Sequence, residues 1–409
     1  MRAIGTQFDD LAKENKNCLE ISKEDEILIR ETLTKFKNGY LNRDIEKIDE
    51  FMEEIFANSS NLSVLGTGNE ELVYGYKEIR ELIKFDWLDW GDVKIDLEHL
   101  KINSADNIAW FYASGDVKQS FKDSKERNES YIDLIKDKLK EGEEQKKVLA
   151  EINWILALTY HNRGFNKREY NWPLGLSGVL IKNKSKWQIV HLHFSIPKAS
   201  FPDERFEAGR QHIENYNILR KKLTKQIENQ ATDEIKEFFQ KAQNKLFNQE
   251  NMDLDIVRQF FDCKKTPSII GVENEYYCDF EEIILFFNNN FSKKIKIDLD
   301  NIVSYKREDI NWFITSGEII CKFREEDLLE LTTNEIEKVI NSDYNDDEKI
   351  FKIKRSIAYV LREIQMGETY SYPIRITGIL NRENKKIVFN SLHFSFPFYY
   401  ILEGKLDGE

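Results

Sequence analysis

The sequence predicts an α+β protein made of two tandem copies of one domain, each with an antiparallel sheet. The first observation is a duplication: "VKIDLEHLKINSADNIAWFYASGDV" from Val93 returns as "IKIDLDNIVSYKREDINWFITSGEI" from Ile295, with nine identities in 25 positions. The second is composition, because 41% apolar residues, including 27 Phe, 17 Tyr and 7 Trp, are enough for two cores. The third is that 18 Gly and 6 Pro leave little room for long irregular linkers.

A second collinear match sets the extent of the two copies. The segment that starts at Arg168 returns from Glu368, with ten identities in 30 positions. The sequence separation between matching positions of the two copies far exceeds the ~20–50 residues of a solenoid repeat. Each copy is therefore expected to be a domain with its own core. We therefore expect five parts along the chain: an N-terminal tail (1–22), a first domain (23–205), a helical linker (206–231), a second domain (232–400) and a C-terminal tail (401–409).

Helices are expected first in each copy. In copy one, apolar residues at helical spacing predict a helix from about Ile27 to Tyr40 and a second from about Ile45 to Ile55. The stretch "NLSVLGTG" predicts a short strand and a tight turn. A third helix is predicted to carry one continuous stripe of side chains: Ile79, Leu82, Ile83, Asp86, Trp87 and Trp90.

Strands and a charged insertion complete the copy. β-rich segments are expected at 93–103, 108–119, 174–182 and 187–196. The residues between the two pairs of strands, about 124–162, are charged and helical in pattern. Copy two has a matching segment from Glu325, "EEDLLELTTNEIEKVINSDYNDDEKIFKIKRSIAYVLREIQ", so each domain is expected to contain a helical insertion.

Composition argues against several classes of protein. A formal net charge of -13 disfavours a general nucleic-acid binder, which needs a positive surface to displace counterions from phosphates. The N-terminus lacks an apolar leader and no apolar run reaches 18 residues, so we expect a cytoplasmic protein without a membrane segment. The cysteines lack the close spacing of zinc ligands, and neither a metal nor a cofactor is expected; they are Cys18, Cys263, Cys278 and Cys321.

Four stretches of copy one carry a family resemblance: "NGYLNRDIEKIDEFM" (Asn38–Met52), "GYKEIRELIKFDWLDWGDVKID" (Gly75–Asp96), "AWFYASGDV" (Ala109–Val117) and "KWQIVHLHFSIP" (Lys186–Pro197). They resemble the SnoaL-like proteins of the nuclear transport factor 2-like superfamily, which includes ketosteroid isomerase, scytalone dehydratase, limonene epoxide hydrolase, polyketide cyclases and non-enzymatic binding proteins. The resemblance implies cone-shaped domains in which a curved sheet wraps around helices and leaves an apolar pocket. It also implies an intrachain pseudo-dimer through the sheets, with the helical insertion as a possible lid.

Two histidines in the last strand of copy one, in "HLHFSIP", suggest a site. His191 and His193 are two residues apart and would point to one face of a strand. Copy two keeps the second as His393 but has Ser391 in place of the first, so a two-histidine metal site is not shared by the copies. His193 is expected either to fix the last strand through a hydrogen bond or to reach the pocket as a ligand or proton carrier.

Asp86 is the sharper catalytic candidate. It lies on the apolar stripe of the third helix, where burial would raise its pKa and make it a general base. Copy two has Asn290 at the equivalent position, which would keep hydrogen bonds but lose the base. The alternative is that Asp86 caps or pairs locally near the helix end. Other residues are candidates for ligand binding: Trp87, Trp90, Trp110, Tyr112, Trp172, Ser195 and His393.

Three functions stay open at this point. The leading hypothesis is a tandem SnoaL-like protein whose first domain binds a small, mostly apolar molecule. The second is a cofactor-independent isomerase, hydratase or cyclase in which Asp86 moves a proton and His193 or Tyr112 stabilises an oxyanion. The third is a structural or protein-interaction module with filled cavities. The sequence leaves the ligand, the reaction and any oligomerisation beyond the pseudo-dimer open.

Overall fold

The computed structural model describes residues 21–397 apart from 69, 123–124, 141, 143, 160–166, 198–209, 250, 289–293, 366 and 384. The first half contains α1 (Lys23–Asn42), α2 (Ile48–Ile55), β1 (Ser63–Leu65), β2 (Leu72–Tyr74), α3 (Tyr76–Asp89), β3 (Asp92–Ile95), β4 (Lys101–Ala105), β5 (Ile108–Lys122), α4 (Lys125–Lys140), α5 (Gln145–Thr159), β6 (Lys167–Asn183) and β7 (Lys186–Ser195).

The second half repeats this order after α6 (Arg210–Thr224). It contains α7 (Asp233–Ala242), which continues as a π-helix (Gln243–Phe247), α8 (Leu254–Phe260), β8 (Ser268–Ile270), β9 (Tyr276–Cys278), α9 (Phe280–Asn288), β10 (Lys294–Ile297), β11 (Val303–Arg307), β12 (Ile310–Lys322), α10 (Glu325–Ile340), α11 (Asp346–Gln365), β13 (Thr369–Glu383) and β14 (Lys386–Ser395).

Each half forms one seven-stranded sheet with the same strand order. The first sheet runs β2-β1-β7-β6-β5-β3, and β4 also pairs with β5. The second runs β9-β8-β14-β13-β12-β10, and β11 also pairs with β12. All pairs between named strands are antiparallel except β1 with β7 and β8 with β14. The predicted α+β class with two tandem domains is confirmed.

The first helices of each half pack on one face of its sheet. In α1, the Ser22 side chain caps the N-terminus by accepting a hydrogen bond from the Asp25 N–H. Apolar residues three or four apart then face the sheet, and α2 and α3 add to the same core. Aromatic rings fill both cores: Phe36, Phe51, Phe56, Trp87 and Phe194 in the first half, and Phe239, Phe247, Phe313, Phe389 and Phe394 in the second.

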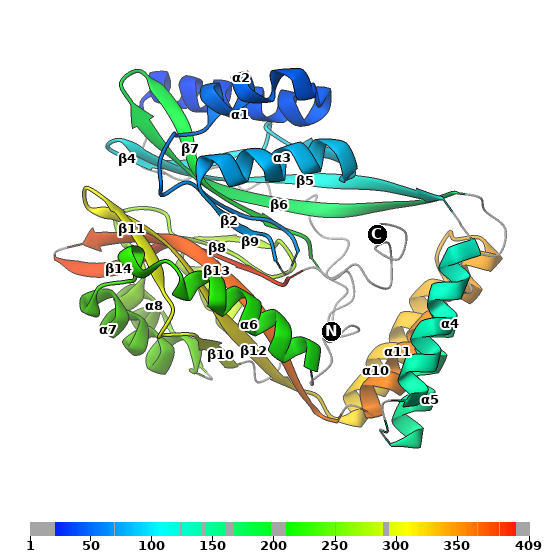
Figure 1. The fold of residues 1–409 in the computed structure, drawn as a ribbon. Coiled ribbons are helices and arrows are strands. Elements are labelled where there is room, and N and C mark those ends of the chain that lie inside the picture. Colours follow the sequence, from blue (N-terminus) through cyan, green and yellow to red (C-terminus); the bar gives the residue numbers. More distant parts are fainter. Residues whose placement is uncertain are drawn as a thin grey trace.

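The other faces of the two sheets pack against each other, as Figure 1 shows in the middle of the molecule. A third apolar cluster joins them and includes Trp110 and Val179 from the first half and Tyr305 and Trp312 from the second. The chain therefore folds as two domains related by approximate two-fold symmetry, with helices outside and sheets in contact. None of the helices in the described part is long and apolar enough to cross a membrane.

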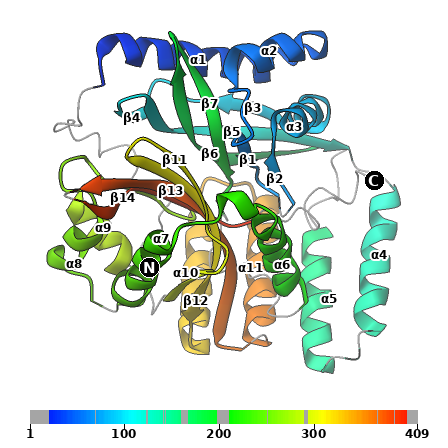
Figure 2. The same ribbon diagram turned by 60° about the vertical axis from the view of Figure 1, so that its left-hand side comes forward.

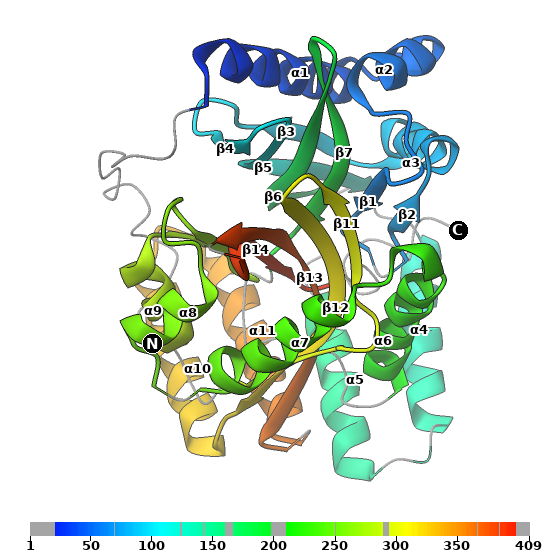
Figure 3. The ribbon, with the colours of Figure 1, turned by 90° about the vertical axis from the view of Figure 1, so that its left-hand side faces the viewer.

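The described residues of the helical insertions pack on each other instead of forming a lid. Helices α4 and α5 leave the ends of β5 and β6, and α10 and α11 leave the ends of β12 and β13. The four lie side by side (Figures 2 and 3), beyond the ends of these strands (Figure 1). Ala157 of α5 and Ala358 of α11 meet in a small cluster, and Arg362 Nε donates to Glu151 Oε1 at 2.7 Å between the same helices. The insertions pair because small residues let the two helix backbones approach.

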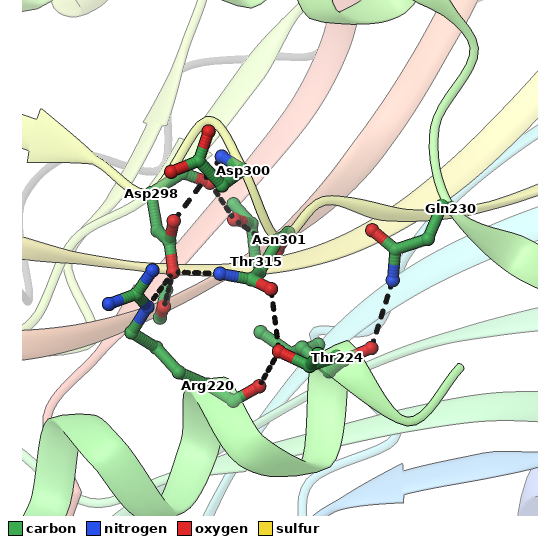
Figure 4. A network of polar contacts seen from close by, with 9 residues as sticks. Arg220, Thr224, Gln230, Asp298, Asp300, Asn301 and Thr315 are labelled. Atoms are coloured by element: carbon green, nitrogen blue, oxygen red, sulfur yellow. Dashed lines mark hydrogen bonds and ion pairs between the residues drawn. The ribbon is translucent and has the colours of Figure 1, made fainter. Parts of the chain in front are cut away.

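The segment predicted as a linker, 206–231, contains α6. Figure 4 shows how polar side chains hold this helix to the second half. Arg220 Nε donates to Asp298 Oδ2 at 2.6 Å, and Thr224 Oγ1 donates to Asn301 Oδ1 at 2.6 Å. Leu219 and Leu223 of the same helix enter the apolar cluster between the sheets. Helix α6 is therefore a structural part of the sheet–sheet interface.

Candidate functional site

A small cavity lies in the first half between α3, the turn that joins β1 to β2, and β7. Its volume is about 20 Å³, which is room for about one water molecule. Its lining combines apolar side chains with two carboxyl groups: Val64, Gly66, Thr67, Glu71, Leu82, Asp86, Trp90 and Phe194. We call this space the Asp86 pocket and residues 66–71 the β1–β2 turn.

Asp86 reaches the pocket because the apolar stripe of α3 continues to the end of the helix. Ile79 and Ile83 of that stripe are buried in the core, and Asp86 follows one turn later. The Tyr40 hydroxyl, at the end of α1, donates to Asp86 Oδ2 at 2.8 Å. On the other side, Glu71 folds back over its own turn and accepts from the Gly68 N–H through Oε2 at 2.5 Å.

These surroundings change the ionisation of Asp86. Burial raises its pKa to about 8, and the neighbouring charge of Glu71 acts in the same direction. The hydrogen bond from Tyr40 and the charge of Arg43 lower the pKa and only partly offset that rise. Burial and the negative charge of Asp86 hold the pKa of Tyr40 well above its usual value. At pH 7 Asp86 is therefore mostly a neutral carboxylic acid, which can both donate and accept a hydrogen bond.

Removing the Tyr40 hydroxyl tests this coupling. We expect Tyr40→Phe to raise the pKa of Asp86 by about one further unit, because a hydrogen bond to a charged group is worth about 1.5–3 kcal/mol. The measurement is a pH titration of ¹³C-carboxyl-labelled aspartate by NMR, with Asp86→Asn to assign the signal. Tyr112→Phe is the matched control, because that hydroxyl donates to the Asn274 carbonyl in the sheet–sheet interface. A lower pKa in Tyr40→Phe would contradict the assigned donor.

His193 does not share the pocket with Asp86. Its neighbour Phe194 lines the pocket, and alternation along β7 turns His193 to the opposite face of the sheet. There Nδ1 lies 2.8 Å from Thr377 Oγ1 and Nε2 lies 2.8 Å from Ser395 Oγ, both in the second half. Of the two expectations for His193, the structure therefore favours the fixing of the last strand. It does not bring the suggested acid–base pair together.

His393 makes the symmetric contacts. Its Nδ1 lies 2.7 Å from Ser177 Oγ and its Nε2 lies 2.9 Å from Ser195 Oγ, and its ring centroid is 3.9 Å from that of His193. Ser195 in turn donates to Asn274 Oδ1 at 2.7 Å. His191 is also buried, with Nδ1 2.8 Å from Ser63 Oγ. Ser195 and His393, predicted as ligand contacts, are thus buried between the sheets instead of lining the pocket.

The predicted aromatic residues lie in three different places. Trp90 lines the pocket, and its indole N–H is buried without a partner among the described residues. Trp87 belongs to the core, where its ring meets Phe51 edge-on at 4.9 Å. Trp110 and Tyr112 lie on the face of β5 that meets the second half. The backbone of Trp172 pairs with β5, and its side chain lies outside the described residues, as does Asn290 of copy two.

Sequence reasoning missed Tyr40 and Glu71 as site residues. Tyr40 is on the expected apolar stripe of α1 and is therefore predicted as a core residue. The one sequence signal for a site role is that its side chain carries a hydroxyl near the end of the helix. The β1–β2 turn was interpreted as a tight turn alone, yet it also forms a wall of the pocket. Among the described residues, one group has metal-ligand spacing, and it is half-buried to exposed on the surface: Asp96, Glu98 and His99.

The comparison with protein families agrees with the predicted resemblance. Residues 29–131 match the family model of the SnoaL-like domain. An NTF2-like superfamily protein from Salmonella enterica serovar Typhimurium is 14% identical over 43% of this chain and 91% of its own, with a TM-score of 0.27. An NTF2-like protein of unknown function from Pseudomonas putida is 10% identical over 47% of this chain and 100% of its own, with a TM-score of 0.28. No curated protein matches the chain.

Proposed function

Because residues 29–131 match the family model of the SnoaL-like domain, we propose that the first half of the chain binds a small, mostly apolar molecule in the Asp86 pocket. The observation that carries the proposal is the Asp86 carboxyl, held by Tyr40 at the wall of an otherwise largely apolar cavity. One directional polar group among apolar walls is typical of small-molecule sites, where it fixes orientation while the walls supply affinity.

The protonation state of Asp86 indicates the chemistry of the ligand. A neutral carboxyl donates a hydrogen bond to a carbonyl, ether or hydroxyl oxygen without the desolvation cost of a buried charge. The buried indole N–H of Trp90, which has no partner among the described residues, offers a second donor beside the same cavity. We therefore propose a neutral ligand with an oxygen acceptor.

Ligand entry requires side chains to move. The cavity holds about one water molecule, so a ligand of several carbon atoms needs Leu82 and Trp90 to swing outward. Both are half-buried, Leu82 in the middle of α3 and Trp90 directly after it, and neither belongs to the fully buried core. Movement of these two side chains would enlarge the pocket without disturbing the sheet.

A binding screen with two Asp86 variants tests the proposal. We expect small neutral ketones, alcohols and phenols to raise the melting temperature at pH 7, and Asp86→Leu to abolish this effect. Asp86→Asn keeps a donor, so it is expected to bind at pH 7 and to lose the pH dependence. In the unsubstituted protein, binding should weaken up to tenfold per pH unit above about pH 8 as Asp86 ionises.

Asp89→Leu is the matched control, because Asp89 is an exposed residue on the same helix. Ligands that stabilise the Asp86→Leu and unsubstituted proteins equally would place binding elsewhere. An absence of any stabilising compound favours the second candidate function, a non-catalytic structural module. The observation behind that candidate is that aromatic rings fill both cores, Phe36, Phe51 and Phe56 in the first half and Phe239 and Phe389 in the second.

A further inference from the structure

Arg375 is a buried arginine of the second half whose side chain ends in the first half. It lies in β13, is 2% exposed, and directs Nη1 to two carbonyls of the β1–β2 turn, those of Gly66 at 2.7 Å and Gly68 at 3.1 Å. Its other nitrogens stay in its own half, where Nη2 donates to the Phe396 carbonyl at 2.8 Å and Nε to Ser395 Oγ at 3.0 Å. The guanidinium thus joins one wall of the Asp86 pocket to the second sheet.

The first half has no equivalent arginine. Gly175 lies opposite Ser195 on β7 as Arg375 lies opposite Ser395 on β14, so the two positions correspond. A Cβ at Gly175 would lie 2.5 Å from Ser195 Oγ and 2.8 Å from Asn274 Oδ1, so a side chain does not fit there. Asn274, from the β8–β9 turn, fills that space instead. The two halves therefore differ at this position. The β8–β9 turn inserts Asn274 into the first half, whereas the β1–β2 turn is hydrogen-bonded by Arg375 of the second half.

The turn that Arg375 holds carries the second carboxyl of the pocket. Gly66, Thr67 and Glu71 all line the Asp86 pocket. The Gly68 N–H donates to the Glu71 carboxylate and so fixes Glu71 to the turn. The carbonyl of the same glycine accepts a hydrogen bond from Arg375. Lys222 of α6 also donates to the Glu70 carbonyl from outside. The position of Glu71 relative to Asp86 therefore depends on groups from beyond the first domain.

We propose that Arg375 is a positioning residue for the Asp86 pocket, so that the second half of the chain completes the site in the first. That this positioning serves ligand binding rests on the proposed function. The test of the positioning itself requires no ligand. A guanidinium suits this role because its planar fork reaches four acceptors at once, which the single ammonium of a lysine cannot do.

A double-mutant cycle on the titration of Asp86 tests the proposal with the full chain. Because the Glu71 charge helps to raise the pKa of Asp86, Glu71→Gln is expected to lower it by roughly one unit. Arg375→Lys, which keeps the positive charge but loses the fork, should release the turn and lower the same pKa. In the Glu71→Gln background, Arg375→Lys should then have little further effect, because both changes act through Glu71.

Arg382→Lys is the matched control, since Arg382 is on the same strand and pairs with Glu234 at the surface. Arg375→Gln, which keeps one NH₂ group for the turn carbonyls, serves if Arg375→Lys does not fold. An Asp86 pKa unchanged by a folded Arg375 variant would overturn the proposal. So would an equal fall in the pKa with and without Glu71. Failure to find a ligand leaves this result unaffected, so the two proposals can fail separately.

Discussion

Lowering the pH from 7 to 5 is expected to reduce the free energy of unfolding by at least about 1 kcal/mol. The cause is the set of three histidines buried at or beside the sheet–sheet interface. Burial lowers the pKa of His191 and of His393 to about 3, and burial with the nearby charges of His393 and Arg375 holds the pKa of His193 well below its usual value. In the folded protein the His191 and His393 rings stay neutral at pH 5, and His193 takes up a proton less readily than it does in the unfolded chain.

The sign follows from proton binding in the two states. In the unfolded chain each imidazole takes up a proton near pH 6.5, so between about pH 3 and 6.5 the unfolded state binds more protons and acid favours it. His191 and His393 each contribute about 2 kcal/mol between pH 7 and 5 on this basis, and His193 acts in the same direction. Asp86 acts oppositely, because its raised pKa makes the folded state the stronger proton binder between about pH 4 and 8, and it offsets about 2–3 kcal/mol of the loss between pH 7 and 5.

Urea unfolding followed by circular dichroism at pH 7, 6 and 5 measures this effect. Replacing His393 by Gln should lower the stability at pH 7 and reduce the pH slope by about 1.4 kcal/mol per unit, the value for one proton. His99→Ala is the control, because that side chain is 75% exposed and lies at the surface. A pH slope that is the same in His393→Gln and in the unsubstituted protein would show that this buried ring does not stay neutral in the folded protein.

These histidines also show what a single sequence can predict. The duplication separated His191 from His193, because only His193 has a counterpart in copy two. Alternation along the strand places His193 on one of the two faces of the sheet, either toward the pocket or toward the other sheet. The residue pattern alone does not distinguish these two faces. The partners that decide it, Thr377 and Ser395, are about 180–200 residues away in sequence. Such contacts depend on how the two sheets dock.

Asp86 was predictable for a different reason. Its place on the apolar stripe of α3 is a local property, so helical periodicity was enough to turn it toward the core and to suggest a raised pKa. The periodicity could not show its partners, Tyr40 and Glu71, because one comes from an earlier helix and the other from a turn. The aligned copies show that Arg375 corresponds to Gly175. A local sequence pattern does not show that the arginine contacts the β1–β2 turn of the other half.

A buried ion cluster joins the two helical insertions through α5 and α11. Arg362 of α11 is buried between two carboxylates: Nε donates to Glu151 Oε1 at 2.7 Å and Nη1 donates to Glu363 Oε1 at 3.1 Å. The three side chains are 8%, 5% and 2% exposed, respectively. We expect Arg362→Met to cost about 3–5 kcal/mol of stability, because it leaves two buried carboxylates without their shared cation.

The cost should fall when the carboxylates are removed with the cation. The triple change Arg362→Met, Glu151→Met and Glu363→Gln is expected to recover most of the loss, because a buried ion pair can often be replaced by apolar groups without destabilisation. Urea unfolding combined with amide hydrogen exchange would show whether the loss is confined to α5 and α11. Arg324→Met is the control, because that guanidinium is 71% exposed and water screens its pair with Asp327. Equal effects of Arg324→Met and Arg362→Met would mean that water reaches the Arg362 cluster.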